Sequence, residues 1–170
     1  MLSSDLLLCP LQGREHTITA HVTIPDSGAE GVLACTGGEF GGWSLFIKDG
    51  KLHYSHNYLK IKEYSLVSSN QVPSGKRKLS IHFTPKGKSL KPDFFTGDVE
   101  LFIDGQKVSE AKEIKMAGQY SVATGYGLLI GRNTGTPVSH QYETPYQFTG
   151  EIAKVTIAVT AIQSDTKNDK

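Results

Sequence analysis

The stretch GGEFGGWSLFIKDGKLHYSHN (residues 37–57) places four glycines before the chain's only tryptophan and an Asp-Gly pair after it. From Trp43 onward, apolar residues recur at every second position, which is typical of a β-strand with one face on a core. Trp43 shares its face with Leu45 and Ile47, so we expect it to be buried. The alternative is an exposed Trp43 that stacks on a sugar ring, but Phe46, on the opposite face, is better placed for that role.

The glycines and the Asp-Gly pair predict how this strand is connected. KDGK (48–51) and IDGQ (103–106) each place Asp-Gly between two strand-like runs. Asp and Gly tolerate the positive φ that a two-residue hairpin turn requires. The glycines of GGEFGG (37–42) predict a bend through which the chain enters the strand with unusual backbone angles.

The same alternation recurs along the chain, in TITAHVTIP (17–25), KLSIHFT (78–84), DVELFID (98–104) and AKVTIAV (153–159). Period two with one apolar face indicates antiparallel strands that each cover a core. No segment combines a helical stripe with helix caps, and SEAKEIKMAG (109–118) is interpreted as strand plus loop. The predicted fold class is therefore all-β, an antiparallel β-sandwich of the jelly-roll type.

The 170 residues predict one domain. We expect a single β-sandwich over residues 14–159, a poorly patterned N-terminal segment over 1–13 and a polar tail over 160–170. Residues 132–147 form a long connection that is rich in turn formers. Loops longer than about 12–15 residues are uncommon unless they bind something, pack as an Ω-loop or are disordered.

Composition limits the partners. Lys and Arg number 18 against 17 Asp and Glu, so no global field attracts nucleic acid or an anionic membrane. No span approaches the ~20 apolar residues of a membrane helix. LLLC (6–9) follows Asp5 rather than a basic segment, so we expect no signal peptide in this chain, and the compartment stays open. Cys9 and Cys35 either pair or are both free.

Two stretches resemble motifs that carry a catalytic nucleophile, but the spacing of their residues does not match those motifs. CPLQGR (9–14) resembles the sulfatase motif C-x-P-x-R, but Pro10 stands one place early and Arg14 one place late. GWSLF (42–46) lacks the second glycine of a nucleophile elbow. We therefore predict no catalytic residue.

Metal and acid–base sites are not predicted either. His53 and His56 are three residues apart, so in a strand they point to opposite faces and cannot hold one metal together. Glycoside hydrolysis needs two carboxylates, and no compact E-x-D-x-E run exists; Asp98 and Glu100 come closest. The sequence predicts no cofactor and no metal site in this domain.

The end of the chain carries a family resemblance. GYGLLIGR (125–132) and FTGEIAKVTI (148–157) resemble the closing strands of concanavalin-A-like, laminin-G-type jelly rolls, in which an apolar strand ending in glycine precedes F-x-G-x-I-x-x-V. Together with HTITAHVTIP, GGEFGGWSLFIKDGKL, IGRNTGTPVS and PYQFTGEIAKVTI, these stretches are similar to the C-terminal domain of bacterial arylsulfatases. The resemblance covers roughly residues 14–159.

The resemblance implies a function. In that family the catalytic domain, with its formylglycine and divalent metal, lies N-terminal to this module, and nothing in this chain resembles it. The chain is then expected to be a non-catalytic accessory domain that packs against a sulfatase-type catalytic domain or mediates oligomerisation, in a periplasmic or secreted parent hydrolase. The main alternative is a carbohydrate-binding, lectin-like module, which could bind glycans. A concanavalin-like glycosidase and a laminin-G-type interaction module are further alternatives.

One loop departs from the family pattern. Asn133, His140 and Gln141 stand where the family has Asp. Calcium needs several charged oxygens, so the loss of three carboxylates predicts that no cation binds here. Arg132 remains, either to bind a carboxylate or sulfated group or, as we favour, to form an intramolecular salt bridge or cap the loop. The candidate ligand or interface surface comprises Phe46, Tyr54, Tyr58, Arg132, Asn133, His140, Tyr142 and Tyr146.

Overall fold

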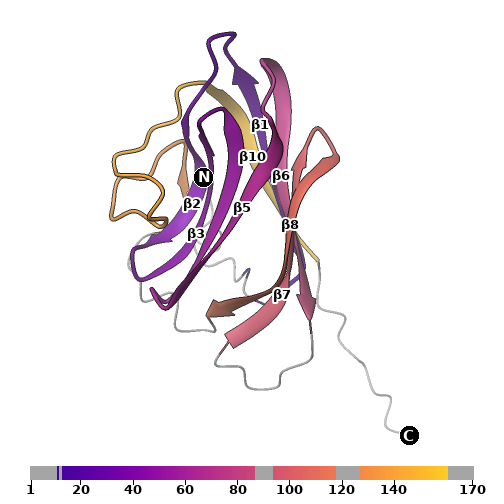
Figure 1. The fold of residues 1–170 in the computed structure, drawn as a ribbon, viewed down its shortest axis with the longest axis vertical. Helices are drawn as coiled ribbons and strands as arrows, with labels where there is room; N and C mark the ends of the chain where they lie inside the picture. Colours follow the sequence, from indigo (N-terminus) through magenta and orange to yellow (C-terminus); the bar gives the residue numbers. More distant parts are fainter. Residues whose placement is uncertain (1–10, 12, 87–93, 118–126, 161–170) are drawn as a thin grey trace, which may run out of the picture.

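Two five-stranded antiparallel sheets pack face to face in the computed structural model (Figure 1), which describes residues 11, 13–86, 94–117 and 127–160. One sheet has the order β10-β1-β6-β7-β8 and the other β5-β4-β3-β2-β9. The strands are β1 (His16–Ile24), β2 (Gly31–Gly38), β3 (Gly41–Lys48), β4 (Lys51–Tyr58), β5 (Lys62–Gln71), β6 (Gly75–Lys86), β7 (Phe94–Ile103), β8 (Gln106–Ala117), β9 (Leu129–Ile130) and β10 (Glu151–Val159). The predicted all-β antiparallel sandwich is confirmed.

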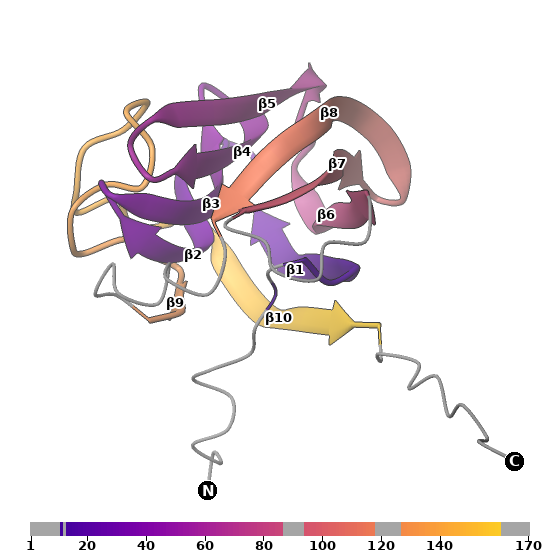
Figure 2. The same ribbon diagram turned by 90° about the horizontal axis from the view of Figure 1, so that it is seen from below.

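The main core lies between the two sheets and is built from alternate residues of each strand. Along β1, buried and half-buried residues alternate without exception, which is the period-two pattern of its sequence. Trp43 is 7% exposed and belongs to this core together with Leu45 and Ile47. The prediction that Trp43 is a core residue is therefore confirmed. Figure 2 shows the two layers from below.

The turns follow the sequence signals. Asp49 and Gly50 join β3 to β4 with φ of 51° and 72°, and Asp104 and Gly105 join β7 to β8 with φ of 50° and 82°. Both Asp-Gly pairs adopt the left-handed conformations that hairpin turns require, as predicted.

The glycine-rich bend is itself a hairpin. β2 and β3 are joined at Glu39 and Phe40, and Gly37 lies directly opposite Gly42. Gly42 has a φ of 137°, and a Cβ built on it would lie 2.0 Å from the Thr36 carbonyl oxygen. The two backbones approach so closely that only glycine fits, which gives the predicted bend its physical reason.

The Gly42→Ala substitution should therefore lower the free energy of unfolding by at least about 3 kcal/mol, because it combines a forbidden backbone angle with a clash against a carbonyl. Gly28 is the matched control, since its φ is also positive (85°) but a Cβ there meets nothing within 4 Å. Gly28→Ala should cost about 1 kcal/mol. Urea denaturation measures both, and equal losses would contradict the close-approach explanation.

Three details differ from or lie beyond the sequence-based expectations. Residues 109–117, expected to be strand plus loop, are strand throughout, as part of β8. Cys35 is a buried free thiol, and burial raises its pKa to about 12; Cys9 lies outside the described residues. Within the described ranges, no helix is long and apolar enough to cross a membrane.

Several histidines are buried. His56 is 6% exposed on the inner face of β4, where burial, helped by nearby His16, lowers its pKa to about 4. Burial also lowers the pKa of His16, whose ring stacks on Phe83 at a centroid distance of 5.2 Å. His53 lies on the other face of β4, against Phe46, so the predicted divergence of His53 and His56 is confirmed. All three rings are neutral when the protein is folded at pH 7.

The buried histidines predict acid lability. Because the folded-state pKa of His56 is depressed below 6.5, its contribution to stability is complete above pH 6.5 and is lost as the pH falls from 6.5 towards 4. The loss from His56 alone should be on the order of 3 kcal/mol. His56→Leu should flatten this part of the pH profile, measured by urea denaturation between pH 7 and 4. Unchanged slopes would contradict the assignment.

Candidate functional site

The outer face of the β5-β4-β3-β2-β9 sheet carries a row of small side chains. The strand register aligns Cys35 with Ser44, Ser44 with Ser55, and Ser55 with Ser65, so the row crosses four strands. Small polar side chains leave room above the sheet for another layer of chain and offer it hydrogen bonds.

Residues 131–150, between β9 and β10, fill that room. Figures 1 and 2 both show this orange loop lying outside the sheet. The Tyr142 hydroxyl donates to Ser44 Oγ at 2.9 Å, Ser55 Oγ donates to Ser139 Oγ at 3.1 Å, and the Gln141 amide donates to Ser55 and Ser65. The predicted long connection therefore packs onto the sheet, and the serine row receives it.

The packed loop closes a second, small core. Phe46 is fully buried beneath it, with the Tyr142 ring edge-on at 4.9 Å and the His53 ring stacked at 5.0 Å. The Tyr146 hydroxyl donates to the Ile47 carbonyl at 3.0 Å, and burial raises the pKa of Tyr146 to about 12. Val32, Cys35 and Val138 complete the cluster.

Two expectations about ligand-contacting aromatics are corrected here. Phe46 was expected to face solvent as a sugar platform, but the loop covers it completely. Tyr54 was also placed on the candidate surface, but it lies on the inner face of β4 and is fully buried in the main core. Tyr142 is 7% exposed, and Tyr58 and Tyr146 are half-buried. A ring beneath a packed layer cannot stack on a sugar.

The three positions that depart from the family's acidic pattern each fasten the loop. Asn133 is buried and donates to the Tyr142 hydroxyl at 2.9 Å. The side-chain amide of Gln141 donates to Ser65 in the serine row, and its backbone carbonyl accepts a hydrogen bond from Lys48 Nζ. His140 contacts Glu63 through its backbone N–H at 3.1 Å and its ring Nδ1 at 2.5 Å. Neutral amides and an imidazole hold this loop, and no three His, Cys, Asp or Glu side chains converge anywhere in the described ranges.

Glu63 is the acidic anchor of the loop. Its side chain is only 13% exposed, and it accepts hydrogen bonds from the Ser139 hydroxyl at 2.5 Å and from His140. Burial by itself would raise the pKa of Glu63, but the hydrogen bonds from Ser139 and His140 outweigh it and lower the pKa. The carboxylate is therefore ionised at neutral pH and holds residues 139–140 against β5.

At the end of the same sheet, an aromatic ring is exposed that the sequence-based interpretation missed. Phe40, at the tip of the β2–β3 hairpin, is 58% exposed. Lys60 Nζ lies 4.9 Å from the centre of its ring and pairs with Glu39 at 3.3 Å. The available signal was the pattern GG-EF-GG, since a two-residue turn between glycine pairs projects its residues into solvent.

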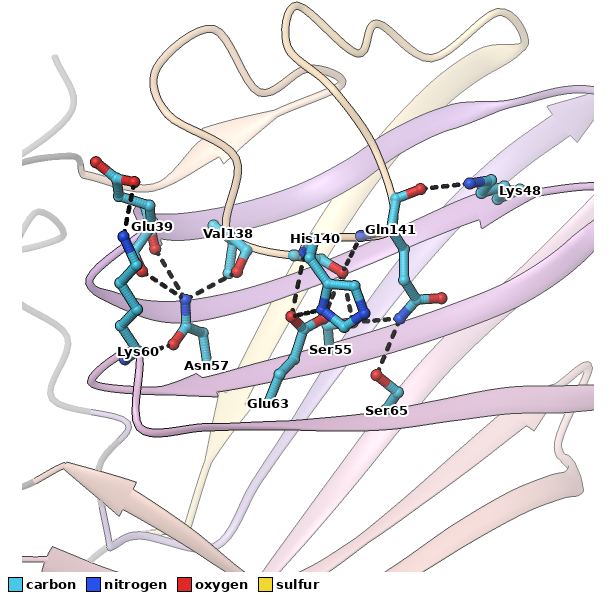
Figure 3. A network of polar contacts seen from close by, with 12 residues as sticks. Glu39, Lys48, Ser55, Asn57, Lys60, Glu63, Ser65, Val138, His140 and Gln141 are labelled. Atoms are coloured by element: carbon cyan, nitrogen blue, oxygen red, sulfur yellow. Dashed lines mark hydrogen bonds and ion pairs between the residues drawn. The ribbon is translucent and has the colours of Figure 1, made fainter.

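One network joins this tip to the loop (Figure 3). Asn57 Nδ2 donates to the carbonyl oxygens of Glu39 and Val138, both at 3.0 Å. The next two residues, Ser139 and His140, donate hydrogen bonds to the Glu63 carboxylate. We call Glu39, Phe40, Lys60, Ser65, His140 and Gln141, with the buried Asn57 and the largely buried Glu63 that support them, the tip surface. It presents two exposed rings, because the His140 side chain is 78% exposed, together with polar side chains that the network holds in place.

Arg132 lies elsewhere, beyond the end of β9. It is exposed, and its side chain forms no ion pair with the residues that the structure describes. Of the two roles that we favoured for Arg132, an ion pair does not form within these ranges, and capping of the loop stays a prediction. Its carbonyl oxygen accepts a weak hydrogen bond from the Cys35 thiol at 3.7 Å.

Solved structures share this architecture. The carbohydrate-binding module CBM40 of a Ruminococcus gnavus sialidase, bound to α2,3-sialyllactose, matches with a TM-score of 0.58 and 12% identity over 87% of this chain and 78% of its own. The fold is that of concanavalin-A-like and laminin-G-like sandwiches. Mouse laminin α1 domains LG4-5 match with a TM-score of 0.55 and 12% identity over 89% of this chain and 37% of that one.

A third structure extends the comparison. A heptameric pentraxin from Limulus polyphemus matches with a TM-score of 0.51 and 11% identity over 85% of this chain and 63% of that one. At these identities the likeness shows the fold alone. No protein-family model matches the sequence, and no curated protein sequence matches it.

Replacing Glu63 by Gln should destabilise the domain by about 2 kcal/mol, because hydrogen bonds to a charged acceptor are lost. The pKa of Glu63 is lowered, so its contribution is present above pH 4.5 and is lost as the pH falls below that value; the variant should lack this loss. Thermal and urea unfolding at pH 7 and below pH 4.5 measure both effects. Glu110→Gln is the control: its two ion pairs are exposed on the opposite sheet, and the free energy of unfolding should hardly change. Equal effects of both substitutions would contradict the anchor role.

Proposed function

We propose that this chain is a carbohydrate-binding, lectin-like module and that the tip surface is its binding site. The observation that carries the proposal is two exposed rings tied to one polar network: His140 belongs to it, and Phe40 is joined to it through the contact with Lys60. Sugar sites combine an apolar ring, which stacks on the face of the sugar, with a few fixed polar groups that orient its hydroxyls.

His140 is the clearest sign of preorganisation. Most of its imidazole faces solvent, yet the Nδ1–H and the backbone N–H are both held by one largely buried carboxylate. Fixing an exposed side chain costs conformational entropy, and a ligand that meets an already ordered group does not bear that cost again. The Nε2 side of the ring remains open to a hydroxyl.

Phe40 supplies the apolar component. Its ring is 58% exposed, and the contact with Lys60, itself held by Glu39, restricts it. The amide of Gln141 and the hydroxyl of Ser65 lie on the same face of the sheet, beside His140. Hydroxyl, amide and ammonium groups are the partners that sugar hydroxyls bond.

The fold likeness supports the same reading. The R. gnavus module has been solved with α2,3- and α2,6-sialyllactose, so a sandwich of this architecture can serve glycan binding. At 12–13% identity, that ligand does not transfer to this chain.

The second candidate is an accessory domain of an arylsulfatase-type hydrolase, packed against a catalytic domain or mediating oligomerisation. It rests on the sequence resemblance over residues 14–159, and the structures compared above include no sulfatase. The native reading frame tests it: a C-x-P-x-R or S-x-P-x-R motif upstream would support the hypothesis, and a stop codon just before Met1 would contradict it.

A glycosidase has little support in the described structure. Asp98 pairs with Lys86 and Lys112, and Glu100 pairs with Lys107, all on the outer face of the other sheet. Carboxylates neutralised by neighbouring lysines serve structure rather than the acid–base chemistry that glycoside hydrolysis needs.

The proposal predicts that Phe40→Ala and His140→Ala each weaken glycan binding by about tenfold, which corresponds to about 1.4 kcal/mol. A panel of neutral, sialylated and sulfated oligosaccharides first identifies a ligand, and isothermal titration calorimetry then compares the variants. Phe40→Ala should leave the unfolding midpoint unchanged, because the ring is exposed.

Phe94→Ala provides a matched control. Phe94 is also an exposed phenylalanine, 40% accessible, with Lys115 Nζ 4.9 Å from its ring, but it lies on the other sheet. Its removal should not change affinity. Absence of binding at millimolar concentrations of every glycan, or an equal loss with Phe94→Ala, would refute the proposal.

A further inference from the structure

A second feature of the surface lies away from the tip surface, where the sandwich ends at β9 and β10. A groove of about 440 Å³ is lined there by Ile130, Gly131, Arg132, Gln147, Phe148, Gly150, Ile152, Ala153, Lys154 and Val155. The lining contains two cations and no acidic side chain. Neither Arg132 nor Lys154 has an ion-pair partner among the residues that the structure describes.

The groove runs beside β10, a strand at the edge of its sheet in the part of the chain that the structure describes. β10 is the last strand of its sheet and pairs, in the described structure, with β1 alone. A nine-residue edge strand presents a row of N–H and C=O groups that another extended segment can pair with. Residues 151–159 contain no proline, which would interrupt such pairing.

The start of β10 is firmly placed. Phe148 N–H donates to the Gly131 carbonyl at 2.8 Å, and Thr149 N–H donates to the Glu30 carbonyl at 2.9 Å. Phe148 is buried in the main core. The wall of the groove is therefore rigid where Arg132 and Lys154 line it, so an incoming segment would meet a preformed surface.

We propose that this groove docks an extended acidic segment of a partner protein, which adds to β10 as a further strand. Backbone hydrogen bonds to the strand edge provide the pairing, and carboxylates at alternate positions of the segment meet Arg132 and Lys154. In an extended chain, alternate side chains share one face at a spacing of about 6.5–7 Å. The guanidinium of Arg132 presents a planar pair of donors that suits a carboxylate.

The charges also set the selectivity. A lysine on an edge strand discourages pairing with basic or identical strands, which protects the protein from edge-to-edge aggregation. The same charge favours an acidic strand.

The test uses a fluorescein-labelled peptide of alternating Glu and Val, eight residues long, and the full chain, with binding followed by fluorescence anisotropy. Saturable binding is expected, and a matched peptide with Gln in place of Glu should bind at least about tenfold more weakly. Raising the salt concentration should weaken binding of the acidic peptide, because the pairs are exposed. Equal binding of both peptides, or none at millimolar concentration, would overturn the proposal.

Variants of the chain locate the site. Arg132→Gln and Lys154→Gln should each weaken binding several-fold, whereas Lys76→Gln, an exposed lysine of β6, should not. Hydrogen exchange should show new protection of backbone amides of β10 when the peptide is bound. Peptide binding that survives the double variant R132Q/K154Q, or protection only elsewhere, would show that the groove is not the site.

The peptide test and the glycan test fail independently. Phe40→Ala should leave peptide affinity unchanged, and R132Q/K154Q should leave glycan affinity unchanged, because the two surfaces share no residue. Loss of both activities in either variant would contradict the separation of the sites.

Discussion

The packing of residues 131–150 onto the outer face of the β5-β4-β3-β2-β9 sheet is the constraint on which the surface of this protein depends. The loop can pack there because the sheet presents three small residues in register, Ser44, Ser55 and Ser65. The loop forms hydrogen bonds with them through Ser139, Gln141 and Tyr142. A larger side chain in that row would lift the loop and leave buried polar groups unpaired. The hydrogen-bonded seam therefore decides which side chains of this face are hidden and which reach solvent.

The consequences for recognition run in two directions. The loop covers Phe46 of β3 and turns its own Tyr142 and most of Tyr146 inwards, so these rings are not available to a ligand. It also orders His140, through Glu63, and closes the polar network that ends at Lys60 and the Phe40 ring. The loop therefore covers the outer face of the sheet around Phe46 and, at its own end, orders the tip surface around His140. Rigid support beneath a few exposed groups is what a binding surface requires.

Buried titratable groups give the sandwich a preferred pH range. Neutral His56 and His16 stabilise the fold above pH 6.5, and ionised Glu63 stabilises the loop above pH 4.5. Both contributions to the free energy of unfolding are lost as the pH falls, because the unfolded chain then binds more protons than the folded chain. The domain is thus suited to neutral surroundings.

The sequence by itself determined the elements of this protein. Period-two alternation placed several of the strands and the buried face of Trp43, Asp-Gly pairs placed two hairpins, and the glycines of GGEFGG predicted a bend, because these signals arise from local backbone geometry. Only the tertiary structure decided which outer face is covered. Parity places Phe46 and Ser44 away from the main core, but it cannot show that residues almost a hundred positions later pack over them. For that reason Phe46 was misplaced, and the groove beside Arg132 became visible only when the strands were assembled. Tyr54 was misplaced for another reason: it shares the inner face of β4 with Leu52 and belongs to the main core.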